Sequence, residues 1–223
     1  MTNPRRPDRD ESEKALGAFN DSLSNLPPEK VKALAEQDTQ GKPWAQGTVH
    51  FQFLYGTMLY EGSRVPQNYQ EAVRWWTKAA GQGNAKAQHA LAICYGLGHG
   101  VAQNFTQSAE MFRQAAENGH AQSQNDIGNC YFSGQGVIRD FEQARVWWMK
   151  AALQDIPQAQ YNIGCVARNL EKDPVKACIW WKLAEGSEPD AAVQLRSVEP
   201  SLTMSQRQQL DIGYNAMLRS MGR

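Results

Sequence analysis

The chain has 223 residues, of which 41% are hydrophobic and seven are Trp, so it can bury a sizeable core. Its 23 Lys and Arg residues balance 23 Asp and Glu residues, and this zero net charge argues against a nucleic-acid-binding protein, which normally carries a basic stripe. Since no apolar run approaches the roughly 18 residues that cross a bilayer, we expect no membrane insertion.

The N-terminal region is predicted to have two parts. Residues 1–13 are polar and lack the apolar stretch of a secretory signal, so we expect a disordered lead-in. Residues 14–43 are predicted to form N-terminal capping helices, of which one ends near Leu26 and a second begins at the Pro27–Pro28 pair. These helices are expected to cover the apolar face of the segment that follows.

Residues 84–119 and 120–155 are two copies of one 36-residue unit and agree at 11 of 36 positions. The same columns recur one period earlier and, with a loop three residues shorter, one period later. We therefore divide residues 44–186 into four repeats, and a repeat of this length is typical of a solenoid. The predicted repeats are 44–83, 84–119, 120–155 and 156–186.

Each repeat is expected to fold as two helices, named helix A and helix B. In the third repeat, Ile127, Cys130 and Tyr131 follow the apolar rhythm of one helix face. The glycines at 134 and 136 then end helix A, because glycine accepts a positive φ. Helix B is predicted to begin at a capping box in three repeats and at a capped proline in the fourth. The pairs are Asn68 with Glu71, Asn104 with Gln107, Asp140 with Gln143, and Asp173 with Pro174.

Residues 187–223 are predicted to be C-terminal capping helices, because a terminal repeat would otherwise expose its apolar face. The helical pattern continues through Leu195, and Thr203 with Gln206 forms another capping box before a helix that runs to about Met221. A partner-binding role for this last helix is the alternative.

Three segments carry a resemblance to a known family. They are Ala159–Gly164, with the sequence AQYNIG; residues 131–137, Tyr-x-x-Gly-x-Gly-Val; and residues 147–152, Trp-Trp-x-Lys-Ala-Ala. The chain resembles the Sel1-like repeat, a relative of the tetratricopeptide repeat. The resemblance implies an all-α fold, a right-handed α/α superhelical solenoid of about four helix-turn-helix repeats with helical caps at both ends. It also implies a protein–protein interaction scaffold.

The chain contains four cysteines. Cys94 and Cys130 occupy the same column of neighbouring repeats, so their Cα atoms are expected to lie roughly 8 to 10 Å apart, beyond the limit of about 7 Å for a disulfide. We expect both to be buried free thiols, whereas Cys165 and Cys178 lie on the two helices of the fourth repeat and could meet. Reduced thiols without a signal sequence indicate the cytoplasm. Because neither CxxC nor Cys-His spacing occurs, we expect no metal site.

The sequence contains no catalytic pattern that we can identify. Its four histidines are scattered without the spacing of paired metal ligands, and neither a GxSxG elbow nor a GxxxxGK[ST] phosphate loop occurs. The glycine-rich triplets at 98–100 and 134–136 recur as the turn between helices A and B, which is a structural role. We therefore expect no enzymatic activity, no catalytic residue and no cofactor. β-Lactam binding or hydrolysis, described for some Sel1-like proteins, cannot be placed on any residue.

A stripe of variable residues remains on helix A once the core columns are removed, at i, i+4 and i+7 in each repeat. Stacked helices would turn the stripes into a grid on the concave surface, where helix A lies in tetratricopeptide-like superhelices. Since aromatic residues and Arg dominate many interfaces, we predict that the grid binds a partner. The predicted residues are Phe53, Thr57, Tyr60, His89, Ile93, Asn125, Asn129, Phe132, Tyr161 and Arg168, and Gly96 and Cys165 share the stripe. The alternative is that Phe53 and Tyr60 pack under the N-terminal cap and that the two asparagines are only solvated.

Two other columns recur and are interpreted as structural. The Gln column is expected to hydrogen-bond the neighbouring repeat, and the Trp pairs of helix B are expected to lie in the core. The columns are Gln52, Gln88, Gln124 and Gln160, and Trp75–Trp76, Trp147–Trp148 and Trp180–Trp181. An exposed Trp from each pair could still form a second, convex surface.

These observations favour a non-enzymatic scaffold or adaptor that binds a partner protein or peptide in the concave groove. The resemblance implies that it acts in a bacterial regulatory or signalling system. An alternative is a dedicated inhibitor, such as an immunity or anti-activator protein for one bacterial enzyme. An enzyme acting on β-lactams is a third. A screen with hydrolase substrates separates the third from the others, since turnover would contradict both binding functions.

Overall fold

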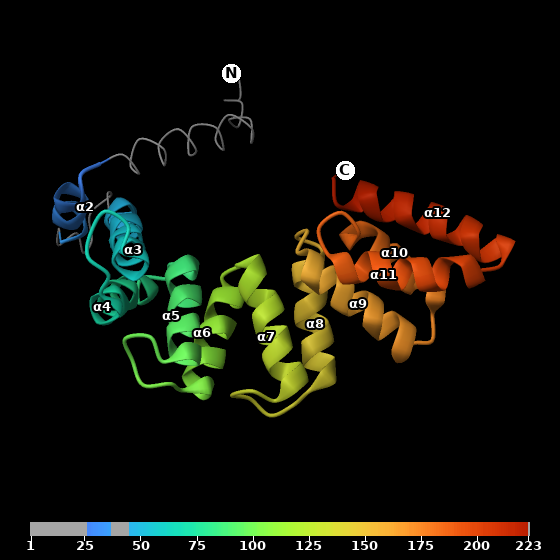
Figure 1. The fold of residues 1–223 in the computed structure, drawn as a ribbon, viewed down its shortest axis with the longest axis horizontal. Coiled ribbons are helices and arrows are strands. Elements are labelled where there is room, and N and C mark those ends of the chain that lie inside the picture. The colour runs from blue at the N-terminus through green and yellow to red at the C-terminus, as the bar shows by residue number, and fades with distance from the viewer. Residues whose placement is uncertain (1–25, 37–44, 223) are drawn as a thin grey trace, which may run out of the picture. The chain divides into compact units, whose positions relative to one another are not determined.

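The structure is a computed structural model that describes residues 26–36 and 45–222 (Figure 1). The predicted lead-in at 1–13, most of the first capping helix and the predicted boundary at 43–44 lie outside these residues. Contacts divide the chain into two compact units, residues 1–84 and 85–223, and each unit is described by itself. In the described residues all regular structure is helical, as the sequence predicted.

The first unit contains α2 (Pro28–Ala35), α3 (Ala45–Glu61) and α4 (Tyr69–Ala80). Proline occupies the first turn of α2, where its missing N–H costs nothing because that group has no partner inside a helix. This confirms the predicted start at the proline pair. Val31 and Ala35 are buried where α2 packs on α3, and α3 and α4 form a helical hairpin.

The second unit contains three further hairpins and two C-terminal helices (Figure 1). Each hairpin packs on the next through the contacts of α6 with α7 and of α8 with α9, so the predicted alternation of helix A and helix B is confirmed. The elements are α5 (Ala85–Leu97), α6 (Phe105–Glu117), α7 (Ala121–Ser133), α8 (Phe141–Ala152), α9 (Pro157–Asn169), α10 (Pro174–Ala184), α11 (Pro189–Val198), a 3₁₀ turn (Glu199–Ser201) and α12 (Met204–Ser220).

The starts of the B helices follow only half of the predicted capping box. The side chain of Asn104 accepts a hydrogen bond from the backbone N–H of Gln107 at 3.0 Å, as expected. The return bond is absent from the cap of α6, because the N–H of Asn104 donates to the carbonyl of Tyr95 in helix A at 2.8 Å. The backbone N–H groups of Asn68 and Asp140 likewise donate to a carbonyl of helix A and not to a side chain of helix B. The full box predicted at Thr203 and Gln206 is confirmed.

The turn between α7 and α8 depends on glycine at one point of close approach. Gly136 has a positive φ of 75°, which an L side chain rarely adopts. A Cβ at this position would also collide with the carbonyl of Phe105, at the start of α6. The turn therefore locks the third repeat onto the second through the backbone.

The Trp pairs of helix B lie in the core, as predicted, with all six side chains buried. The second Trp of each pair packs against a glycine of helix A, and a Cβ on Gly128 would lie only 2.5 Å from Trp148 Cδ1. In the second repeat, where Phe112 replaces that Trp, the corresponding residue of helix A is Ala92. The smaller ring leaves space for the extra methyl group.

The Gln column connects helices, which confirms its structural interpretation. The Gln124 side chain donates to the carbonyl of Ala116 at 3.1 Å and accepts from Gln154 at 2.7 Å. It thus joins the end of α6 to the end of α8. In the described structure, Gln52 receives a bond from Gln82, and Gln88 one from Asn118.

All four cysteines are free. The buried thiols of Cys94 and Cys130 confirm the prediction, and burial raises the pKa of each to about 11. Cys178 is also buried with a pKa of about 11, whereas Cys165 is half-buried. The contact considered between Cys165 and Cys178 forms no disulfide.

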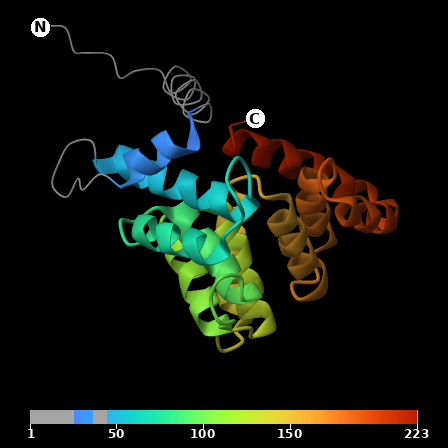
Figure 2. The same cartoon turned by 60° about the vertical axis from the view of Figure 1, so that its left-hand side comes forward.

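The last two helices cover α10, the helix B of the fourth repeat (Figures 1 and 2). Leu195 of α11 and Leu210 of α12 are buried in one cluster with Trp181 of α10. The apolar face of the last repeat is therefore covered, which is the role predicted for C-terminal capping helices.

Candidate functional site

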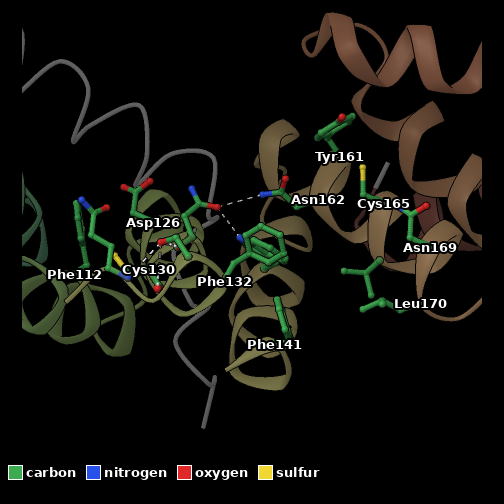
Figure 3. A pocket seen from close by; sticks show the side chains of 15 residues that line it. Phe112, Asp126, Cys130, Phe132, Phe141, Tyr161, Asn162, Cys165, Asn169 and Leu170 are labelled. Carbon is green, nitrogen blue, oxygen red and sulfur yellow. Dashed lines mark hydrogen bonds between the residues drawn. The ribbon is translucent and has the colours of Figure 1, made fainter. Parts of the chain in front are cut away.

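A hollow of about 880 Å³ opens between helices α7, α8 and α9 (Figure 3). Its volume falls in the range of ligand pockets. The lining is mainly apolar and comes from the ends of α7 and α9 and the start of α8. The hairpin turns bring these ends together, so residues from the third and fourth repeats face each other.

The α7–α8 wall of the hollow is aromatic. The ring of Phe132 lies 5.5 Å from the ring of Phe141 and 5.3 Å from that of Trp148, measured between centroids. Phe132 and Phe141 remain 51% and 48% exposed, because they belong to the last turn of helix A and the first turn of helix B. This wall therefore presents large apolar area that the fold itself does not cover.

The opposite wall is formed by α9 and the residue after it. Tyr161, Cys165 and Leu170 lie across the hollow from the phenylalanines (Figure 3). A hydrogen bond with Cys165, together with burial, raises the pKa of Tyr161 to about 12. The phenol is therefore neutral at physiological pH, and this wall contributes no charge.

Carboxamides connect the two walls. Asn129 Oδ1 accepts a hydrogen bond from Trp148 Nε1 at 3.0 Å and another from Asn162 Nδ2 at 3.4 Å. Both bonds are among the dashed lines in Figure 3. They fix the orientation of the Asn129 side chain, which is exposed.

Among the described residues, Asp126 is the one charged residue that lines the hollow. Its carboxylate accepts from the side chains of Gln122 at 3.2 Å and Asn125 at 3.3 Å, and it lies 3.1 Å from His89 Nε2. The His89 ring in turn lies 4.8 Å from that of His120, whose pKa is lowered by burial and by His89. These hydrogen bonds hold the carboxylate at the edge of the hollow.

A second hollow of about 270 Å³ adjoins the first on the α5–α6 side. The two share Phe112, Cys130 and Gln135, so they form one groove across three repeats. Gly96 occupies the column that holds Phe132 in the next repeat. Phe105, at the start of α6, is 41% exposed and lines this second hollow. Hereafter "the groove" means these two hollows together.

The predicted stripe reaches the groove only in part. Asn129, Phe132 and Tyr161 line the larger hollow, and Ile93 lines the smaller one. Arg168 is exposed and is not among the lining residues.

Two predicted residues contact Asp126 and do not line either hollow. His89 contacts its carboxylate directly. Asn125 is only 2% exposed, so it does not lie on the surface as the stripe required. Its amide nitrogen donates to the Asp126 carboxylate at 3.3 Å, whereas its buried amide oxygen has no hydrogen-bond partner in the described structure.

The stripe residues of the first repeat lie in the other unit. The carbonyl of Phe53 accepts from Trp76 Nε1 at 3.1 Å and from the hydroxyl of Thr57 at 3.0 Å. The ring of Tyr60 lies 5.0 Å from that of Tyr69 and 5.2 Å from that of Trp76. Tyr60 thus packs on α4, in the same way as Phe132 packs on α8.

Several groove residues were missed from the sequence. Phe141 is the first residue of a helix B, and Leu170 lies in the turn after a helix A, whereas the predicted stripe was confined to helix A. Asn162 lies one position beyond the stripe, and Asp126 one position beyond Asn125. The recurrence of Phe at 105 and 141 is visible in the sequence and was a usable signal. The structure shows that both side chains are partly exposed.

The described part of the chain shows neither a cluster of metal ligands nor a helix suited to a membrane. Residues 26–36 and 45–222 contain no group of three or more His, Cys, Asp or Glu side chains able to hold a metal ion. Among the same residues, no helix combines the length and the apolar character needed to cross a membrane.

Comparison with known proteins agrees with the repeat period. The Sel1 repeat matches four times, at residues 49–84, 85–120, 121–156 and 157–185. No curated protein matches the sequence significantly.

The solved structures that are similar to this chain include two at more than 30% identity. One is a protective antigen of uropathogenic Escherichia coli with an SLR fold, at 33% identity and a TM-score of 0.64 over 68% of this chain. The other is a Sel1 repeat protein from Oxalobacter formigenes, at 31% identity and a TM-score of 0.64 over 70% of this chain. The chain spans 33% of the length of the first and 65% of the second. The four matched repeats cover more than half of the sequence, and the chain therefore belongs to the Sel1 repeat family.

Proposed function

We propose that this protein is a non-enzymatic scaffold or adaptor that binds a partner protein or peptide in the groove. The observation that carries the proposal is the half-exposed aromatic wall of Phe132 and Phe141, set inside a hollow of about 880 Å³. Contiguous exposed apolar surface marks interaction sites more often than free surface, and aromatic side chains contribute much of the binding energy at interfaces. Sel1 repeat proteins generally mediate protein–protein interactions, which supports this assignment.

The setting of the function is part of the proposal. Both similar structures come from bacteria, so we place the protein in a bacterial regulatory or signalling system. Its four free cysteines fit a reducing compartment, and the cytoplasm is the compartment we propose.

The proposal is tested by photo-crosslinking in native cells. A benzophenone amino acid replaces Leu170, which is 68% exposed at the edge of the hollow, and in a control strain it replaces Val193, an exposed residue of α11. A groove-bound partner is expected to crosslink from position 170 and not from position 193. Equal crosslinking from both positions would contradict the groove as the binding site.

The captured protein is then purified and titrated against wild type and variants. We expect Asn129→Ala combined with Phe132→Ala to lower the affinity at least about tenfold, because both side chains face the partner. Leu170→Ala is a second variant, at a position that is mostly exposed, and Val193→Ala is the matched control. Unchanged affinity of both groove variants, with normal melting temperatures, would refute the proposal. If the partner is an enzyme, assaying it with and without this protein separates an adaptor from an inhibitor.

A further inference from the structure

The orientation of one amide in the groove can be assigned from chemistry. An indole N–H only donates, so the atom of Asn129 that lies 3.0 Å from Trp148 Nε1 must be its oxygen. The same oxygen accepts from Asn162 Nδ2. The amide nitrogen of Asn129 therefore faces away from both, and no acceptor within the described residues takes its N–H groups. Since Asn129 is exposed, this donor is open to a partner.

Asn162 supplies the complementary atom. With its nitrogen directed to Asn129, its oxygen points away from that bond (Figure 3). The pair thus presents one donor from α7 and one acceptor from α9. Every residue of an extended chain other than proline exposes one C=O and one N–H, which is the complement of this pair.

The surroundings of the amide pair restrict the side chains of such a segment. The aromatic wall can accommodate an apolar side chain, and Asp126 is the one charged residue that the described structure places at the hollow. The side chains that contact its carboxylate are two neutral amides and His89, and in the described chain no Lys or Arg lies within 4 Å of it. A basic residue of the partner is therefore favoured there, and an acidic one is disfavoured.

The distance between these features sets a spacing. Asp126 precedes Asn129 by three residues of α7, or about 4.5 Å along the helix axis. An extended peptide advances about 3.3 Å per residue. A side chain one or two residues from the amide-paired unit therefore reaches the carboxylate.

We propose that the groove binds an extended peptide segment that pairs its main chain with Asn129 and Asn162. The segment places an aromatic or large aliphatic side chain between Phe132 and Leu170, and it carries Lys or Arg within two residues of that side chain, against Asp126. This inference rests on the proposed function and names the chemistry of its partner.

The first test is selection of peptides from a random twelve-residue phage-displayed library on the full-length protein. We expect enrichment of sequences with Lys or Arg one or two residues from Phe, Trp, Tyr or Leu. Enrichment of acidic residues at that spacing, or of apolar residues with no charge preference, would overturn the inference.

The second test assigns the charge preference to its carboxylate. A selected peptide and its Lys→Glu counterpart are titrated by fluorescence anisotropy against wild type, Asp126→Asn and the matched control Glu117→Gln, an exposed residue of α6 outside the groove. We expect wild type and control to prefer the basic peptide about fivefold at low salt, and we expect high salt to reduce this preference. Asp126→Asn should remove it. A preference that survives in Asp126→Asn contradicts the assignment.

The third test addresses the main chain. The peptide residue that places its apolar side chain between Phe132 and Leu170 is called the anchor residue. A peptide methylated at the backbone nitrogen of this residue loses the N–H that pairs with Asn162. We expect it to bind wild type more weakly than the unmodified peptide, and we expect the two to bind Asn162→Ala equally. If methylation weakens binding to both proteins to the same extent, the peptide main chain does not hydrogen-bond with the amide pair.

The outcomes separate this inference from the proposed function. If selected peptides lose binding in the Phe132→Ala variant but show no charge or main-chain preference, only the inference fails. If no peptide is selected and the crosslinking experiment captures nothing from position 170, the proposed function fails and the inference fails with it.

Discussion

The glycine that faces a tryptophan decides how closely the two helices of a repeat approach each other. Gly56, Gly128 and Gly164 each pack against the second Trp of a pair, and a Cβ on any of them would overlap the indole ring. The second repeat has the alternative combination of Ala92 with Phe112. The size of the residue on helix A is thus matched to the size of the aromatic residue on helix B: glycine faces Trp, and alanine faces Phe.

This pairing gives a prediction at the scale of single residues. Gly128→Ala should destabilise the protein by about 1 kcal/mol or more, because overpacking outweighs the gain in helix propensity. Adding Trp148→Phe to Gly128→Ala should recover stability, since the double variant reproduces the combination of the second repeat. Urea denaturation of the two single variants and the double variant measures the coupling. A double variant no more stable than Gly128→Ala would contradict the matching.

Each helix B begins with a cap that also joins it to helix A. Asp140 accepts from the backbone N–H groups of Glu142 at 2.9 Å and Gln143 at 3.0 Å. Its own N–H donates to the carbonyl of Tyr131 at 2.9 Å. The cap side chain stabilises the helix, and the cap backbone fixes the hairpin.

At this scale, removal of the cap side chain tests its contribution. Asp140→Ala should lower the free energy of unfolding by about 1 kcal/mol, while Asp140→Asn should change it little, because Asn caps about as well as Asp. Thermal and urea unfolding of the two variants check this. An equal loss in both would show that the negative charge, and not the hydrogen bonds, stabilises α8.

The Gln column acts between elements, since Gln124 bridges the ends of α6 and α8 from its place on α7. Gln124→Ala removes both bonds and leaves the amide of Gln154 without this partner, so we expect a loss of about 1 to 3 kcal/mol. Gln158→Ala, at an exposed position of α9, is the control and should lie within about 0.5 kcal/mol of wild type. The urea midpoints of the Gln124→Ala and Gln158→Ala variants are compared. Equal midpoints would contradict a structural role of the Gln column.

At the scale of the whole molecule, buried thiols should determine the stability at high pH. The pKa of Cys94, Cys130 and Cys178 is raised from 9.0 to about 11 in the folded chain. A folded pKa above the unfolded value means that the unfolded state loses its protons first. The thiols therefore contribute stability that is fully present below pH 9 and is lost as the pH rises towards about 11.

This linkage is measured by urea unfolding at a series of pH values. We expect the midpoint to fall from pH 9 to pH 11 in wild type. The fall should be smaller in Cys130→Ala, which has one thiol fewer to ionise. A midpoint that stays constant over this interval would show that the thiols ionise alike in both states.

Much of the fold could be predicted from the sequence, because the 36-residue period repeats the local signals of each element. Caps, proline starts and helix-ending glycines act within a few residues, so they place the helices in any context. The missing half of the capping box shows the limit. The backbone N–H of Asn104 has two possible partners, and only the packing of helix B on helix A selects the carbonyl of Tyr95.

The candidate site was less predictable. The helical period placed Asn129, Phe132 and Tyr161 on one face of helix A, and all three line the larger hollow. The same period also selected Asn125, which is buried against Asp126. A stripe on one helix cannot tell which of its edges a neighbouring repeat will cover.

The sequence by itself therefore determined the repeat, the order of the helices and the residues of the core, since these depend on local propensity and on burial at a fixed period. The tertiary structure alone decided where the groove lies and which atoms it offers. Its walls come from helices of three repeats, and the free donor of Asn129 exists because Trp148 and Asn162 both bind the oxygen of that amide. Such atoms are placed by packing between helices, which no periodicity along the chain records.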